Sequence, residues 1–274
     1  MFETARHSID SLYLWAGQPF HGFSPSVLTA IVVIYFIAFL ARGVLGFGAV
    51  APIVIITSLL IDPHHAVLLA LVAGTVPQLQ MLPEGLRDGD KAIARPVLAA
   101  MMVGLPAGVW VFANMGTDWF MLVLGSVIFV LTLLDMGRVL ERALADVNLR
   151  ALPIALGLSA TAGFVNGLAG AGGVISIAVY LKQACTGYVS LRATLVLVGT
   201  VLLCWRLVVT VAAGLVSWRL LWEALLLLPV VYVGVWLGTH YFRTMTPARY
   251  HRLVQLVILV SAFGLIFKGI SRIL

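Results

Sequence analysis

The stretch R-G-V-L-G-F-G-A-V-A-P-I, residues 42–53, returns in altered form as N-G-L-A-G-A-G-G-V-I-S-I, residues 166–177. Both stretches lie inside apolar sequence, and the two copies are 124 residues apart (167 − 43). In this register Gly43, Gly46 and Gly48 align with Gly167, Gly170 and Gly172. Paired apolar segments that are interrupted by glycine are typical of ligand-binding sites in membrane transporters. The repeat therefore predicts where a ligand binds before it predicts which ligand.

The composition is that of a protein that crosses a membrane many times. Of its 274 residues, 62% are apolar and only 10% are charged, and the mean hydropathy is +1.09. A soluble domain keeps roughly a quarter of its residues charged. The net charge of +6 does not indicate a nucleic-acid partner, because the basic residues fall between apolar runs and form no block. Cys185 and Cys204 stand alone and no metal-binding motif accompanies them, so we expect neither a metal nor a cofactor.

The apolar runs predict an all-α fold with about ten transmembrane segments. Taking roughly 20 residues for one crossing, we place the spans at 25–41, 44–61, 64–83, 92–113, 117–137, 151–166, 168–184, 188–215, 218–242 and 250–272. The count falls to eight if each pair divided at a glycine element is one broken unit. Four parts follow: a tail at 1–24, a first repeat at 25–137, a hydrophilic linker at 138–150 and a second repeat at 151–274.

Positive charge predicts the orientation of these spans. With ten spans, one face collects twelve of the seventeen Lys and Arg residues: Arg42, Arg87, Lys91, Arg95, Arg138, Arg142, Arg150, Lys182, Arg192, Arg243, Arg249 and Arg252. That face should be cytoplasmic. The linker is then cytoplasmic, and the N-terminal tail lies on the opposite side. Because five is odd, the second five-span repeat enters the membrane upside down relative to the first, which predicts inverted repeats and alternating access.

The glycine elements allow two interpretations. Glycine can adopt the backbone angles that break a helix, and the free N–H groups of the helix that follows would bind an anion without a charged side chain. Alternatively, the glycines only allow helices to pack closely. We favour the binding site, because each copy follows a polar or basic residue at the same position, Arg42 and Asn166. The predicted backbone ligands are Gly46, Gly48, Gly170, Gly172 and Gly173, with Asn166 and Arg192 completing the site and Arg42 and Gln78 as further members.

Other polar residues of the spans receive structural interpretations. Arg192 is either a countercharge for the anion or a residue whose side chain reaches the lipid headgroups. We expect Arg206 to reach the outer interface, and the pair His64 and His65 to lie exposed in a loop. Asp135 and Glu223, like Asp118 at the start of the span 117–137, lie near span ends. No buried carboxylate relay for protons or sodium is therefore visible in the sequence.

Three functional classes remain open at this point. A transporter of small anions is favoured, with the bilayer and the anion as its partners. An anion channel would use the same site without alternating access. A membrane-embedded lipid-modifying enzyme is disfavoured, because the sequence lacks H-E-x-x-H, a usable G-x-S-x-G and paired catalytic carboxylates. A homo-oligomer is compatible with the sequence, which does not specify the oligomeric state.

Three motifs in order carry a family resemblance: L-G-F-G-x-x-x-P-I at residues 45–53, G-F-V-N-G-L-A-G-A-G-G-V-I at 163–175, and S-L-R-A-T at 190–194. Together they resemble the TauE/SafE family, sulfite-exporter-like permeases of the bacterial inner membrane. The resemblance implies transport of small sulfur-containing or organic anions such as sulfite, sulfoacetate and other sulfonates. The family's glycine clusters fall on Gly46, Gly48, Gly167, Gly170, Gly172 and Gly173. The chain departs from the family pattern at Ala49, Val50 and Ser176, which makes the two half-sites unequal.

Overall fold

The computed structural model describes residues 19–20, 23–45, 50–137, 139, 142, 152–171, 173–185, 187–241 and 247–273. Within these ranges the chain forms helices and no strand, so the expected all-α fold is confirmed. The helices are α2 (Pro25–Leu45), α3 (Val50–Leu60), α4 (Pro63–Asp88), α5 (Lys91–Asn114), α6 (Thr117–Met136), α8 (Leu152–Ala169), α9 (Gly173–Ala184), α10 (Tyr188–Ala212), α11 (Trp218–Tyr241) and α12 (Pro247–Ile273).

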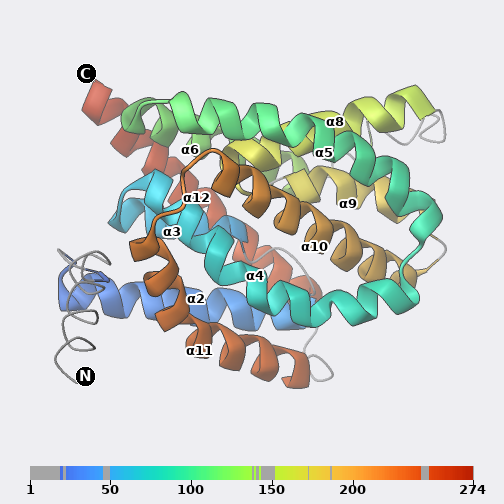
Figure 1. Ribbon diagram of the computed structural model, residues 1–274, viewed down its shortest axis with the longest axis horizontal. Coiled ribbons are helices and arrows are strands. Elements are labelled where there is room, and N and C mark those ends of the chain that lie inside the picture. Colours follow the sequence, from blue (N-terminus) through green and yellow to red (C-terminus); the bar gives the residue numbers. More distant parts are fainter. Residues whose placement is uncertain are drawn as a thin grey trace, which may run out of the picture.

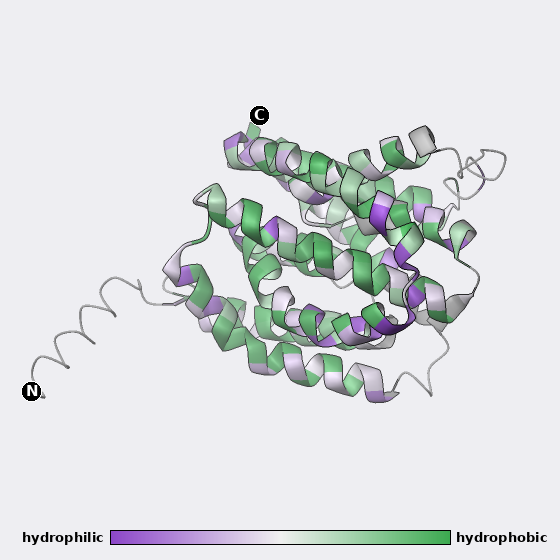
Figure 2. Ribbon diagram, turned by 45° about the vertical axis from the view of Figure 1, so that its right-hand side comes forward, coloured by the Kyte–Doolittle hydropathy of each residue, from purple (hydrophilic) through white to green (hydrophobic). Residues whose placement is uncertain are grey.

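Seven of the described helices are long and apolar enough to cross a membrane, which confirms a polytopic membrane protein. Helices α3 and α9 are shorter, with 11 and 12 residues. At 1.5 Å per residue they reach about 16 to 18 Å, against a hydrocarbon core of about 30 Å. The spans expected at 44–61 and 168–184 therefore began too early, since these helices start at Val50 and Gly173. Figure 2 shows that apolar residues predominate along the helices.

Local sequence explains the sharp turns between the long helices. Asp62 caps α4 by accepting from the His65 N–H at 3.0 Å, with Pro63 in the first helical position. Asp90 caps α5 by accepting from two backbone N–H groups of that helix. Each cap satisfies donors that the first helical turn leaves free. The turns at 61–62, 89–90 and 115–116 are consequently short, and α3 to α6 follow one another closely along the chain.

Two pairs of helices pack side by side in the same direction. Helix α5 lies along α8, and α2 lies along α11 (Figure 1). Along the second pair, Gly234 faces the Phe36 carbonyl and Gly238 faces the Leu40 carbonyl, so both numbers rise together. Along the first pair, Gly104 of α5 faces the Ala160 carbonyl of α8 and Gly108 faces the Phe164 carbonyl, so the numbers again rise together. A Cβ at these glycines would meet backbone, so close helix packing requires glycine here.

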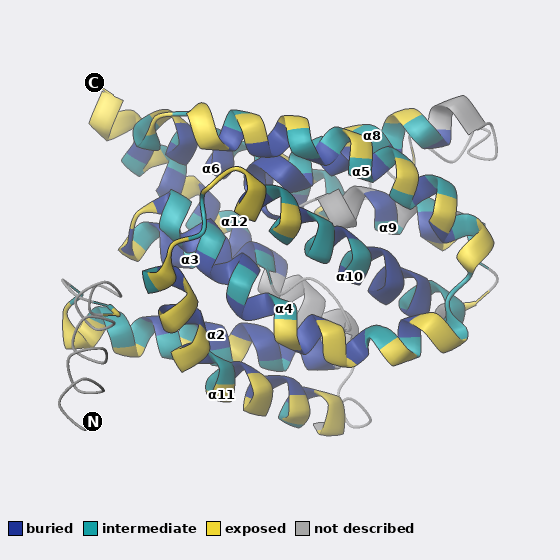
Figure 3. Ribbon diagram, viewed as in Figure 1, coloured by how far each residue is buried: buried dark blue, intermediate teal, exposed yellow. Residues whose placement is uncertain are grey.

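Two other pairs pack in opposite directions. In the pair of α4 and α10, Gln78 contacts Thr200 whereas Asp90, just beyond α4, contacts Thr194. In the pair of α6 and α12, Gln255 donates to Asp135 at one end and Arg272 lies 3.7 Å from Asp118 at the other. These pairs are therefore antiparallel. Helices α4 and α10 pass through the middle of the molecule, where buried residues predominate, while α5 and α11 expose their outer faces (Figure 3).

Candidate functional site

The second glycine element lies where one helix ends and the next begins. Helix α8 ends at Ala169, Gly170 has φ +72°, and α9 begins at Gly173. The Gly170 N–H donates to the Asn166 carbonyl at 2.9 Å, which closes the last turn of α8. A left-handed φ strongly favours glycine, which has no Cβ to clash with the preceding turn. Helix α8 therefore ends here because position 170 is a glycine, which the sequence already shows.

The glycines of this element do not share one role. Gly167 lies inside α8 and packs on α5, where an added Cβ would meet the Leu105 carbonyl and Gly108. Gly43, its counterpart in the first element, packs on Val235 and Gly238 of α11 in the same manner. Close packing, the alternative interpretation of the elements, thus accounts for these two positions, whereas Gly170 terminates a helix.

Arg206 of α10 projects into the gap left by Gly170. Its Nη2 donates to the Gly167 carbonyl at 3.1 Å, and its Nη1 occupies the space that a Cβ of Gly170 would need. The side chain is 3% exposed, so the expectation that it reaches the outer interface is wrong. Its Nε is buried and has no hydrogen-bond partner. The sequence contains little signal for this burial, because the residues around Arg206 in α10 are apolar on every side.

The first glycine element also begins with a buried arginine. Arg42 is 5% exposed, and its Nε and Nη1 have no hydrogen-bond partner among the residues that the structure describes. Its guanidinium carbon lies 5.8 Å from the centre of the Phe39 ring, one turn earlier in α2. Helix α2 ends at Leu45 and α3 begins at Val50. The predicted ligands Gly46 and Gly48 lie outside the described residues, as does Gly172 of the second element.

Gln78 is buried in the middle of the crossing between α4 and α10. Its Nε2 donates to Thr200 Oγ1 at 2.8 Å and to the Val196 carbonyl at 3.3 Å. Its Oε1 is buried and accepts no hydrogen bond. The preceding Pro77 lacks an N–H and so removes one backbone bond from α4 at this level. An unused amide acceptor and a weakened helix therefore coincide at the centre of the molecule.

The remaining predicted residues lie in two places. Asn166 is 8% exposed and sits in the last turn of α8, and Gly173 is the first residue of α9, so both adjoin Gly170. Arg192 lies near the start of α10, where its Nε is 3.4 Å from Glu84 Oε1. It is 14 residues from Arg206 (206 − 192), or about 21 Å along the helix. The structure thus places Gly170 against Arg206, with Asn166 in the helical turn that Gly170 closes, and Arg192 beside Glu84.

A buried carboxylate lies at the end of the bundle where α4 and α11 begin. Glu223 is fully buried and accepts from Arg219 Nε at 2.9 Å, from the Phe20 N–H at 3.0 Å, and bonds His65 Nε2 at 2.5 Å. His64 contacts the Phe112 carbonyl through Nε2 at 3.1 Å. The expectation that both histidines are exposed in a loop is therefore wrong. The reason is that α4 begins against α5 and α11, which cover the first turn.

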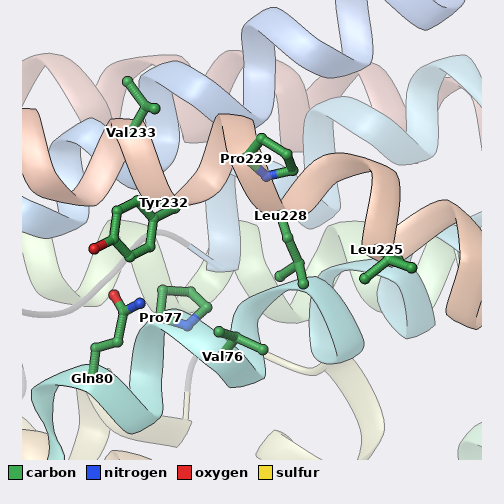
Figure 4. A pocket seen from close by; sticks show the side chains of 8 residues that line it. All are labelled: Val76, Pro77, Gln80, Leu225, Leu228, Pro229, Tyr232 and Val233. Carbon is green, nitrogen blue, oxygen red and sulfur yellow. The ribbon is translucent and has the colours of Figure 1, made fainter.

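An apolar groove of about 470 Å³ opens between α4 and α11 (Figure 4). Pro77 and Pro229 face it from the two helices, and the side chains of Tyr232 and Gln80 lie at the same end. No charged residue lines it, and most of its lining is exposed on the outer surface of the bundle. The groove therefore faces the lipid and does not resemble an anion site.

Comparison with known proteins identifies the family of this membrane protein. The sequence model of the family described as Sulfite exporter TauE/SafE matches residues 31–265, which is most of the chain. The chain therefore belongs to the TauE/SafE family, as the glycine motifs predicted, and is a multi-pass membrane protein of a transporter family for sulfite-type anions. Comparisons with curated proteins and with solved structures gave no significant match.

Proposed function

We propose that this protein is a secondary transporter that moves small anions bearing a sulfite or sulfonate group across the bacterial inner membrane by alternating access. Sulfite, sulfoacetate and other sulfonates are the substrates that its family implies. The observation that carries the proposal is the direction of the packed helices, because it supports two halves that run oppositely through the membrane.

Two helices of the first half run opposite to the helices that hold the same place in the second half. In the proposed division, α2 to α6 form the first repeat and α8 to α12 the second. The third helices, α4 and α10, are antiparallel, and so are the fifth helices, α6 and α12. The first helix of each half lies parallel to the fourth helix of the other. An axis in the membrane plane would produce both relations, whereas an axis along the membrane normal would make equivalent helices parallel.

The proposed site lies at the two helix breaks. Free N–H groups at the start of α3 and α9 would bind the anion, and buried polar side chains would complete the site. The ligands in this proposal are Gly46, Gly48, Gly170, Gly172 and Gly173 with Asn166, Arg42, Gln78 and Arg192. Burial of Arg42, Asn166 and Gln78 supports their membership. The ion pair between Arg192 and Glu84 favours a role for Arg192 at the cytoplasmic opening, if the basic face is cytoplasmic.

Transport is tested in vesicles that contain the purified protein. We expect saturable uptake of labelled sulfite and acceleration by unlabelled sulfite on the opposite side. Gly172→Leu should abolish this flux, because a side chain there would fill the approach to the backbone donors. The matched control is Gly157→Leu, at an exposed position of α8 with no atom near an added Cβ. Flux that does not saturate and shows no counter-transport would establish the channel instead, and flux that survives Gly172→Leu would contradict the site.

A further inference from the structure

We propose that the protein holds its anion at two separate stations on opposite sides of the membrane centre, one at Arg206 and one at Arg42. The proposal rests on the proposed transport function and deepens it, because it replaces one central site by two charged ones. Each station combines a buried guanidinium with the end of a helix that precedes a glycine break.

Arg206 is a buried cationic side chain with an unused hydrogen-bond donor, as expected of a residue that binds an anion. It is 97% buried (100 − 3), and its Nη2 donates to the Gly167 carbonyl at 3.1 Å. Its Nε has no acceptor. A buried guanidinium without a countercharge is costly, and in membrane proteins such groups mark substrate pathways. An oxyanion bound here would supply both the missing negative charge and the missing acceptor.

Arg42, at the first glycine element, is a second buried guanidinium. It is 95% buried (100 − 5), and its Nε and Nη1 both lack acceptors. The face of Phe39 provides a weak interaction with the cation but accepts no directed hydrogen bond. An oxyanion oxygen beside either nitrogen would supply the acceptor that it lacks.

Other arginines of the described part differ from these two. Arg87, Arg192, Arg219 and Arg272 each lie within ion-pair distance of a carboxylate. Neither Arg42 nor Arg206 has such a partner among the described residues. Four arginines near helix ends thus have carboxylate partners within the chain, whereas the buried Arg42 and Arg206 are available to a ligand.

The two stations lie in opposite halves of the membrane. Helix α10 is followed by the short turn 213–217 and by α11, so these two helices run in opposite directions. Helix α2 is parallel to α11 and therefore antiparallel to α10 (Figure 1). Arg206 precedes the end of α10 by six residues (212 − 206), and Arg42 precedes the end of α2 by three (45 − 42). Each arginine is thus near the end of its helix, on opposite sides.

The ligand class follows from the donors. Guanidinium N–H groups donate to oxygen acceptors, which sulfite and the sulfonate end of an organic sulfonate both present. Each station lies on one side of the membrane centre, so an anion that passes from one to the other crosses that centre.

The number of stations is tested by titrating sulfite into the purified protein and measuring the heat of binding. We expect two sulfite ions per chain, one after Arg206→Gln, one after Arg42→Gln and none after both changes. Each change should weaken its own station by about 100-fold. Arg272→Gln is the matched control, since it removes a half-exposed guanidinium near a helix end. One sulfite ion per chain that either change abolishes, or binding that neither change alters, would overturn the proposal.

Two further measurements keep the result interpretable. Arg206→Lys and Arg42→Lys retain the charge without the guanidinium, so binding should weaken less than with Gln even if Gln variants fold poorly. Flux through vesicles separates the two proposals. If two sulfite ions bind in an arginine-dependent way but no saturable flux occurs, the transport proposal fails and the two stations stand. If flux is saturable but binding depends on neither arginine, the two stations fail and the transport proposal stands.

Discussion

Gln78 of α4 donates its amide Nε2 to Thr200 Oγ1 of α10 at 2.8 Å, and the two side chains join the central helices of the bundle. The Thr200 hydroxyl in turn donates to the carbonyl of Val196, one turn earlier in α10, at 2.7 Å. Both side chains are buried, so water cannot take over as the hydrogen-bond partner if one of them is removed. This bond holds the crossing at the level where Pro77 weakens α4.

Replacement of Thr200 by Val should destabilise the protein by about 1 to 3 kcal/mol. The change keeps the shape of the side chain but leaves one amide donor of Gln78 bonded only weakly, to the Val196 carbonyl at 3.3 Å. Thermal unfolding in detergent measures the effect. Thr200→Ser retains the hydroxyl and is the control, and equal melting temperatures for the Val and Ser variants would show that the bond contributes nothing.

Replacement of Gly170 by Ala should destabilise the protein and displace Arg206. The residue adopts φ +72°, which costs a residue with a Cβ about 1 to 2 kcal/mol. The new Cβ would also collide with the Arg206 guanidinium. Unfolding of the purified variant gives the first effect, and sulfite titration gives the second. Gly157→Ala within α8 is the control and should be neutral or slightly stabilising, because no atom lies near an added Cβ and alanine favours helix.

Replacement of Glu223 by Gln should be far more costly than replacement of Asp118 by Asn. Glu223 of α11 is buried and bonds His65 of α4, the Phe20 N–H and Arg219 of its own helix, whereas Asp118 is half exposed and pairs with Arg272. Loss of a buried paired charge costs about 3 to 5 kcal/mol, and an exposed pair contributes about 0 to 1 kcal/mol. Unfolding measurements on the two variants compare them directly. Similar losses would mean that the cluster at Glu223 is not an anchor.

Several features of the fold were predictable because they depend on local composition. Apolar runs of about 20 residues predicted the crossing helices, and a glycine that must adopt φ +72° lies inside the predicted break. The family assignment followed from the same short motifs. Helix ends were less predictable, because α2 continues to Leu45 and α8 to Ala169, beyond the first glycine of each element. A glycine that packs against a neighbouring helix leaves its own helix intact.

The sequence by itself determined that the chain is helical, lies in a membrane and carries two glycine elements, because hydropathy and glycine conformation act within a few residues. Only the tertiary structure decided what those elements face. His65 and Glu223 are 158 residues apart, and Arg206 meets a carbonyl 39 residues away. In helices that are apolar on every side, periodicity barely distinguishes a lipid-facing position from a buried one. Packing between distant helices therefore buries Arg206 and Arg42. Their Nε donors lack acceptors among the described residues because of that burial.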